Sequence, residues 1–352
     1  IIVMAVSGQI DYLLKKDVGF NKEAVMYTFT AYDFNDTRNQ VLRDELKKHS
    51  FIKEVSLSSE MLISQGLWTT TVKKVEDTSD FELSIQIKTA DTSFINLFDV
   101  PLIAGRNYRI GSDETLINEM AATKLGFKSP DEAIGERIKY DTELIIVGVI
   151  KNIHTQSMYS AIRPMMIKPS NRGLFTTNVK LKPNIDLVAA KEQMQASYRS
   201  VYPNESHEFE FLDKTVENFY QSELRMKRVL GFATAVAILI SCLGLFGLSS
   251  FTIAQRTKEI SIRKVLGASL SNILMLITKE YAFLIAIAFV LSIFPAWYFL
   301  NNWLSSFQYR MELSVVTFIL AGVIAFILSI SIVALHSLKA ANSNPSEVLK
   351  DE

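Results

Sequence analysis

The sequence contains few of the residue types that most often act in catalysis or metal binding, and their spacing does not suit either role. The four histidines, His49, His154, His207 and His336, show none of the spacings that hold a metal ion. The sequence has no GxxxxGK loop for nucleotide phosphates and no GxSxG turn for a nucleophilic serine. Its one cysteine, Cys242, lies in a long apolar run, where packing is a commoner role than catalysis. The sequence therefore predicts no enzyme activity, no metal site and no cofactor.

The most specific pattern is the short charged segment Thr257–Ser269, which reads TKEISIRKVLGAS. If a helix forms here, its apolar side chains fall on one stripe: Ile262, Val265, Leu266, Leu270 and Ile273. Four charged side chains surround the stripe: Lys258, Glu259, Arg263 and Lys264. Such a helix can lie on a membrane surface or dock into a groove on a partner protein. The pattern alone leaves both interpretations open.

The composition limits the class of protein that contains this segment. The 352 residues include 37 Lys and Arg against 37 Asp and Glu, so there is no net basic charge to attract nucleic acid. A single cysteine excludes an intrachain disulfide framework and a cysteine-rich metal site. The chain is 49% hydrophobic yet 21% charged, which indicates two unlike parts, one apolar and one polar.

The apolar part contains three long runs without Asp, Glu, Lys or Arg, at about 229–255, 281–303 and 313–337. Each exceeds the ~20 residues that a helix needs to cross a bilayer, and core helices of a soluble bundle rarely lack charges for so long. Ile1–Ile10 is also apolar but too short to span. We expect it to be the end of a truncated transmembrane helix, with a short buried strand or an ordinary soluble N-terminus as the alternative. The sequence thus predicts an α-helical transmembrane domain with three complete spans and the end of a fourth.

Residues 11–224 have the composition of a soluble domain. Strands and helices mix there without a regular βαβ alternation, so an α+β fold is expected, followed by a helical stalk at Asp213–Arg228. Four further segments have clear patterns, strand-like at Phe81–Lys88 and Leu144–Val149 and helix-like at Glu114–Leu125 and Leu187–Tyr198.

Loop charges predict the orientation in the membrane. The loop at 256–280 contains five Lys and Arg residues: Arg256, Lys258, Arg263, Lys264 and Lys279. The loop at 301–312 contains only Arg310. The positive-inside rule therefore places the first loop and the C-terminus in the cytoplasm and the α+β domain outside.

Several segments resemble one known family. TKEISIRKVLGAS is similar to the helix after the second transmembrane span in permeases of the MacB/FtsX type, which belong to ABC transporters. The end of the chain, Asn344–Glu352, resembles the short tail of these permeases. Ile87–Arg106 and Ile145–Ile167 resemble the MacB-like periplasmic core domain, although the family often has aspartate where this chain has Asn152.

The resemblance implies a domain organisation. It makes 1–10 the end of a truncated transmembrane helix, 11–224 an extracytoplasmic MacB-like periplasmic core domain with stalk, and 225–352 an FtsX-like permease domain. The segment at about 257–270 becomes a coupling helix that contacts the ATPase. The residues expected to bind this partner are Lys258, Glu259, Ile262, Arg263, Lys264, Leu266 and Gly267.

The resemblance also implies a function. The chain is expected to be a multi-pass permease subunit of the bacterial plasma (inner) membrane, coupling ATP hydrolysis by a separate ABC ATPase subunit to movements of the extracytoplasmic domain during export. Its other expected partners are a second permease half, as a homodimer or pseudo-dimer, the lipid bilayer, and a periplasmic adaptor or envelope protein. The alternative is an FtsX-like membrane regulator that signals to an envelope enzyme without moving cargo. A receptor with its own cytoplasmic effector is weaker, because few residues follow Leu338.

Overall fold

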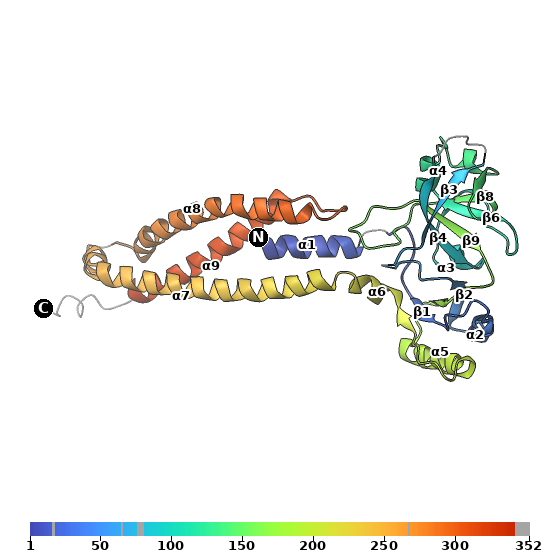
Figure 1. The fold of residues 1–352 in the computed structure, drawn as a ribbon. Helices are drawn as coiled ribbons and strands as arrows, with labels where there is room; N and C mark the ends of the chain where they lie inside the picture. The colour runs from blue at the N-terminus through green and yellow to red at the C-terminus, as the bar shows by residue number, and fades with distance from the viewer. Residues whose placement is uncertain (16–17, 65, 76–80, 267, 342–352) are drawn as a thin grey trace. The chain divides into compact units, whose positions relative to one another are not determined.

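The structure is a computed structural model that describes residues 1–15, 18–64, 66–75, 81–266 and 268–341. The chain forms two compact units. The first, Leu14–Tyr220, contains all the strands described, and we call it the sheet domain. The second combines Ile1–Leu13 with the chain from Gln221 onward, and we call it the helical domain. The predicted combination of an α+β domain with an α-helical transmembrane domain is confirmed (Figure 1).

One half of the sheet domain is a four-stranded antiparallel sheet with two helices. Its strand order is β11-β1-β10-β2, and its chain order is βαββαβ, as in ferredoxin-like folds. The elements are β1 (Val25–Phe29), α2 (Arg38–Leu46), β2 (Ile52–Ser58), β10 (Thr176–Leu181), α5 (Leu187–Val201) and β11 (Glu210–Phe211). Leu42, Val55, Val179, Met194 and Tyr198 share its core, so both helices cover the same face of the sheet. We call this the sandwich half.

The other half is inserted between β2 and β10 and closes on itself. Its strands pair in the cycle β4-β3-β7-β8-β6-β9, and β9 returns to β4 through a parallel pairing. The strands are β3 (Thr69–Lys74), β4 (Leu83–Ala90), β6 (Glu114–Asn118), β7 (Arg137–Lys139), β8 (Glu143–Ile150) and β9 (Met165–Pro169). The remaining elements of this region are α3 (Phe94–Leu97), β5 (Leu102–Gly105), α4 (Glu119–Lys124) and the 3₁₀ turn η1 (Asp131–Ala133). We call this the barrel half.

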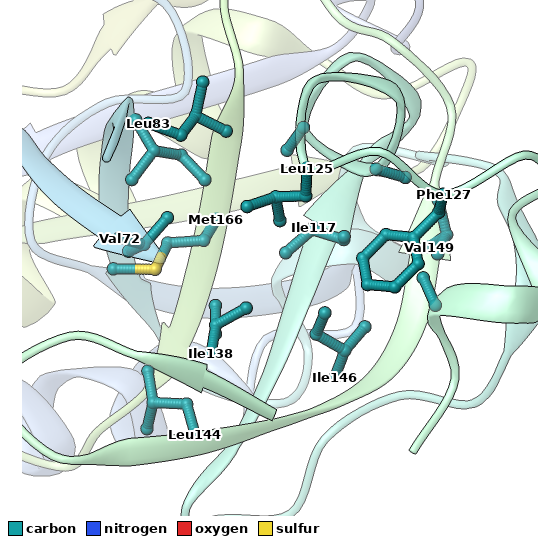
Figure 2. Packing of buried hydrophobic residues seen from close by; sticks show 14 of the residues in the cluster. Val72, Leu83, Ile117, Leu125, Phe127, Ile138, Leu144, Ile146, Val149 and Met166 are labelled. Atoms are coloured by element: carbon teal, nitrogen blue, oxygen red, sulfur yellow. The ribbon is translucent and has the colours of Figure 1, made fainter. Parts of the chain in front are cut away.

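The inside of the barrel half is a hydrophobic core. Figure 2 shows Val72, Ile117, Ile138, Ile146 and Met166 pointing toward one another from different strands. All five side chains are almost completely buried. At roughly 1.5–3 kcal/mol for each large apolar side chain, this cluster is the main source of stability for the half.

Of the four segments whose patterns are described above for this domain, three form the predicted element and one does not. The expected strands at Phe81–Lys88 and Leu144–Val149 correspond to β4 and β8, and the helix at Leu187–Tyr198 is part of α5. The helix predicted over Glu114–Leu125 is instead strand β6 followed by the short helix α4. The strand forms because β8 and β9 pair with it on its two sides, and Asn118 then starts the helix by accepting a hydrogen bond from the Ala121 N–H at 2.9 Å.

Polar side chains fill the junction between the two halves, where β2 and β4 pair only at Ser58 and Ala90. The Asp91 carboxylate accepts hydrogen bonds from the Ser56 hydroxyl at 2.6 Å and the Leu57 N–H at 2.9 Å. Burial raises the pKa of Asp91, and these hydrogen bonds oppose the shift. Buried polar groups are stable only when they are paired, so this network fixes how the halves meet.

A buried ion pair lies at the same junction. The Lys88 side chain is 1% exposed, and its ammonium group donates to Glu60 Oε1 at 2.7 Å and to the Met61 carbonyl at 2.8 Å. Burial lowers the pKa of Lys88, against the opposing effect of the Glu60 charge. The charged lysine therefore depends on Glu60 for compensation.

Glu114, at the start of β6, makes the free energy of unfolding depend on pH. Its carboxylate accepts hydrogen bonds from the Arg106 and Arg109 guanidinium groups, each at 2.9 Å, and from the Arg109 N–H. The Arg106 hydrogen bond, followed by those of Arg109, holds the pKa of Glu114 well below its usual range. A depressed folded-state pKa stabilises the protein above the unfolded pKa, near 4.5, and this contribution is lost as the pH falls below it.

We expect Glu114→Gln to lower the free energy of unfolding by about 1–2 kcal/mol at pH 7, since both arginines are solvent-exposed and their charges are screened. The difference from the wild type should narrow as the pH falls below about 4.5, because the unfolded chain then binds a proton at Glu114 while the folded carboxylate, with its lowered pKa, stays ionised. Denaturation of the full chain in detergent at a series of pH values measures this difference in unfolding free energy. Glu82→Gln, which changes an exposed carboxylate, is the control. A difference that does not vary with pH would contradict the assignment.

The helical domain contains three long apolar helices, α7 (Gln221–Val265), α8 (Leu270–Leu304) and α9 (Val315–Ala341). Their segments long and apolar enough to cross a membrane are Gln221–Arg256, Thr278–Leu304 and Val315–Leu335, in agreement with the three predicted spans. α8 continues through Pro295. The helix predicted over Asp213–Arg228 is interrupted, because α6 (Leu212–Asn218) ends before α7 begins.

The first helix, α1 (Ile2–Lys15), is attached to the loop between α8 and α9. The fully buried Gln9 donates from Nε2 to the Tyr309 carbonyl at 3.0 Å and accepts from the Met311 N–H at 2.8 Å. Ala5 and Ile10 are also buried. The segment from Ile2 to Ile10 is therefore helical, and a short buried strand does not form there.

Candidate functional site

The charged segment after the first apolar run is the end of α7, with no break between them. The predicted separate helix at 257–270 is therefore wrong in its bounds. The Ala268 N–H donates to the Arg263 carbonyl at 3.0 Å, a bond between residues five apart that typically closes a helix C-terminus. α8 begins at Leu270, so Leu270 and Ile273 belong to the next helix and the predicted apolar stripe does not form on one helix.

A different face forms at the end of α7 instead. Glu259, Ile262, Arg263 and Leu266 are spaced by three, four and seven residues, which places them on one side of the helix. Ile262 is 52% exposed and Leu266 is 80% exposed. Arg263 Nη2 lies 2.6 Å from Glu259 Oε1, an ion pair one helical turn apart. We call these four residues the tip face.

The base of this extension is packed against the other two long helices. Ile253 of α7, Tyr281 of α8 and Val333 of α9 form a buried cluster. The Tyr281 hydroxyl donates to Thr252 Oγ1 at 3.1 Å, and Arg256 Nη1 lies 2.9 Å from Glu280 Oε1. The tip face is therefore carried on a helix that is fixed to α8 and α9 just below it.

Four of the seven predicted partner-binding residues come together on the tip face: Glu259, Ile262, Arg263 and Leu266. Lys258 and Lys264 are also within α7, although the structure does not describe their side chains, and Gly267 lies outside the described residues.

The contacts at the base were not predicted as part of the site. The available signal was the pair of opposite charges, Arg256 and Glu280, that flanks the first two apolar runs. Among the residues that the structure describes, no group of three or more His, Cys, Asp and Glu side chains could hold a metal ion. The described part of the site therefore consists of an exposed apolar pair, Ile262 and Leu266, beside the Glu259–Arg263 ion pair.

Comparison with known proteins gives two family matches. The model of the MacB-like periplasmic core domain matches residues 1–197, and the model of the FtsX-like permease C-terminal domain matches residues 231–345. No curated protein matches the chain significantly.

Three solved structures are similar to the chain at low sequence identity. The periplasmic region of MacB from Actinobacillus actinomycetemcomitans is 11% identical, with a TM-score of 0.43, and the match covers 59% of this chain and 97% of that structure. A permease-protein domain from Porphyromonas gingivalis is 16% identical, with a TM-score of 0.40 and coverage of 54% and 91%. The extracellular domain of the noncanonic ABC-type transporter YknZ from Gram-positive bacteria is 12% identical, with a TM-score of 0.39 and coverage of 53% and 99%.

The two family matches cover most of the chain without overlapping. They follow the same order as the sheet domain and the long apolar helices. Since the first match alone covers more than half of the residues, the chain belongs to the MacB/FtsX-like family of ABC transporter permeases, as a multi-pass membrane protein with a periplasmic core domain.

Proposed function

We propose that this chain is the permease subunit of an ABC exporter and that a separate ATPase subunit docks on the tip face of α7. One observation carries the proposal: an exposed apolar pair, Ile262 and Leu266, lies on a helix end whose base is packed against α8 and α9. A partner that binds this end of α7 can therefore exert force on all three long helices.

The chemistry of the tip face suits a protein partner. Burying an exposed leucine side chain contributes about 2 kcal/mol, and Leu266 is nearly free of contacts within the chain. The adjacent Glu259–Arg263 pair is half-exposed and offers charges of both signs at the rim. A central apolar contact with charged groups around it is the usual composition of a protein–protein interface.

The proposed mechanism uses the continuity of α7. When two ATPase subunits close on ATP, they displace the two helix ends on which they are docked. The displacement passes along α7, because a helix with its backbone hydrogen bonds intact is stiff along its axis. Two ATPase subunits need two permease halves, so the assembly is a dimer or a pseudo-dimer.

The proposed orientation places the tip face and the C-terminus in the cytoplasm of a bacterium, with the chain in the plasma membrane. The support is the excess of Lys and Arg in the 256–280 loop over the 301–312 loop. Trp297, Tyr298 and Trp303 lie near the opposite end of α8, where amphipathic rings favour the membrane interface.

We expect Leu266→Glu to reduce the ATPase that copurifies with the permease from membranes by at least tenfold and to abolish ATP-driven export. A charge on the contact surface has to be desolvated or opposed by the partner, which can cost several kcal/mol. Membrane insertion should be normal, because Leu266 is 80% exposed and supports no core. The measurement is quantitative recovery of the ATPase at matched permease expression.

Met275→Glu is the matched control. Met275 is 70% exposed but belongs to α8 and not to the tip face of α7, so ATPase recovery should stay at the wild-type level. If the tip face rests on lipid instead, Leu266→Glu leaves ATPase recovery unchanged, and that result would refute the docking role.

A further inference from the structure

A cavity of about 380 Å³ opens where the sandwich half and the barrel half of the sheet domain meet. Its wall comes from both halves: Phe34 precedes α2, Phe175 precedes β10, Trp68 precedes β3, Tyr140 follows β7, and Lys168 belongs to β9. The volume is within the usual range for small-molecule sites. A molecule bound here would contact both halves at once.

One aromatic side chain of the wall, Phe34, is packed closely against its neighbours. The ring of Phe34 lies only 2.8 Å from the position that a Cβ atom would occupy on Gly173, whose φ is +66°. Only glycine combines this conformation with so close an approach. The Phe175 ring supports Phe34 from the side, with ring centroids 5.2 Å apart. The cavity therefore has a preformed stacking surface, which keeps the entropic cost of binding low.

Two of these aromatic side chains are unusually exposed. Trp68 is 57% exposed and Phe34 is 55% exposed, although both line the same concave surface. Large aromatic side chains contribute strongly to binding when a flat apolar group covers them. Their exposure inside a cavity is typical of a surface that a ligand covers.

The charges of the wall do not balance. Lys168 and Arg172 both line the cavity, and within the described part of the chain neither forms an ion pair with a carboxylate. Lys168 Nζ lies 5.5 Å from the centre of the Tyr140 ring, which holds the cation over the cavity wall. Glu60, the one acidic residue in the described wall, is already neutralised by the buried Lys88. The cavity is left with two cations available to a ligand.

We infer that this cavity is a binding site for a small organic anion that carries an aromatic or aliphatic ring. The ring stacks against Trp68 and Phe34, and the anionic group, a carboxylate or a phosphate monoester, pairs with Lys168 and Arg172. The inference is independent of the docking proposed for α7. Because the wall comes from both halves, the bound anion also holds the halves in one arrangement.

Tryptophan fluorescence of the full chain tests the site directly. Trp297 and Trp303 are the only other tryptophans, so a Trp297→Phe, Trp303→Phe background leaves Trp68 as the single reporter. N-acetylphenylalanine supplies a ring with a carboxylate, phenyl phosphate supplies a ring with a phosphate, and N-acetylphenylalaninamide is the neutral comparison. We expect a saturable change in Trp68 fluorescence with at least one anion, at an affinity at least tenfold higher than for the amide.

Substitutions then locate the anion. Arg172→Gln and Lys168→Gln should each weaken binding of the responding anion about fivefold to tenfold, and Lys124→Gln, an exposed cation on α4, should leave the affinity unchanged. Arg172 is exposed in a loop, so its substitution keeps the fold, which an unchanged melting temperature verifies. Comparing the two anions identifies the preferred anionic group. Absence of a saturable response to either anion, equal affinity for the amide, or unchanged affinity in both cavity variants would overturn the inference.

Discussion

Glu60→Ala should destabilise the sheet domain by about 3–5 kcal/mol, because it leaves the buried ammonium group of Lys88 without its counter-charge. The Lys88 side chain is only 1% exposed, so water does not solvate its ammonium group in place of Glu60. Thermal unfolding of the full chain in detergent measures the effect. Glu54→Ala, which removes a more exposed carboxylate of β2, should change stability by less than about 1 kcal/mol.

The dependence on pH distinguishes an uncompensated charge from a simple loss of packing. Burial lowers the pKa of Lys88, so the folded state binds fewer protons than the unfolded state as the pH approaches 10.5. The difference in free energy of unfolding between the wild type and Glu60→Ala should therefore become smaller as the pH rises from 7 to 10. The double variant Glu60→Leu, Lys88→Met should recover most of the lost stability, because an apolar pair of similar size needs no compensation. A double variant as unstable as the single one would disprove this explanation.

Gly148→Val should have a comparable effect, about 3 kcal/mol or more, through a steric clash in the barrel half. A Cβ atom on Gly148 would lie 2.4 Å from the Arg106 carbonyl oxygen and 2.8 Å from a Leu116 methyl group. The carbonyl is backbone and cannot rotate away, and Gly105 and Gly148 are directly paired between β5 and β8. We expect the cooperative unfolding transition to occur at a lower temperature than in the wild type. Proteolysis within the barrel half should also be faster.

Gly111→Ala separates this clash from the general cost of losing a glycine. Gly111 has a φ of +78°, but nothing lies within 4 Å of its Cβ position, so alanine there should cost only about 1–2 kcal/mol. If Gly148→Val and Gly111→Ala were equally stable, the close approach of strands β5 and β8 would not be the cause of the destabilisation.

The sequence is sufficient to predict the long helices and insufficient for the barrel half. Runs of more than twenty uncharged apolar residues predict α7, α8 and α9 directly, because composition alone determines whether such segments can cross a bilayer. Glu114–Asn118 looks helical by composition but forms β6, since neighbours distant in sequence pair with both of its sides. The closure of the ring through β4 and β9 depends on a pairing across about eighty residues, which local patterns do not encode.

The candidate site was predictable in its residue types but not in its geometry. The spacing of Glu259 and Arg263 predicts the ion pair that the structure contains. The predicted apolar stripe that continued to Leu270 does not form, because α7 ends before that residue. The glycine at position 267 is the sequence feature that indicates this helix end. The Lys88–Glu60 pair and the aromatic cavity join residues far apart in the chain, so only the folded arrangement brings them together.

The unbroken length of α7 has a mechanical consequence. The helix of 45 residues is about 68 Å long, and its buried contact with α8 and α9 at Ile253 lies well toward one end. Measured from Ile253, the arm to Val265 is about 18 Å and the arm to Gln221 is about 48 Å. If α7 turned as a rigid rod about Ile253, a sideways step of about 2 Å at its short end would become a movement of about 5 Å at its long end. Under the proposed docking of an ATPase at the tip face, a small displacement of that end would therefore give a larger displacement at the other end of α7.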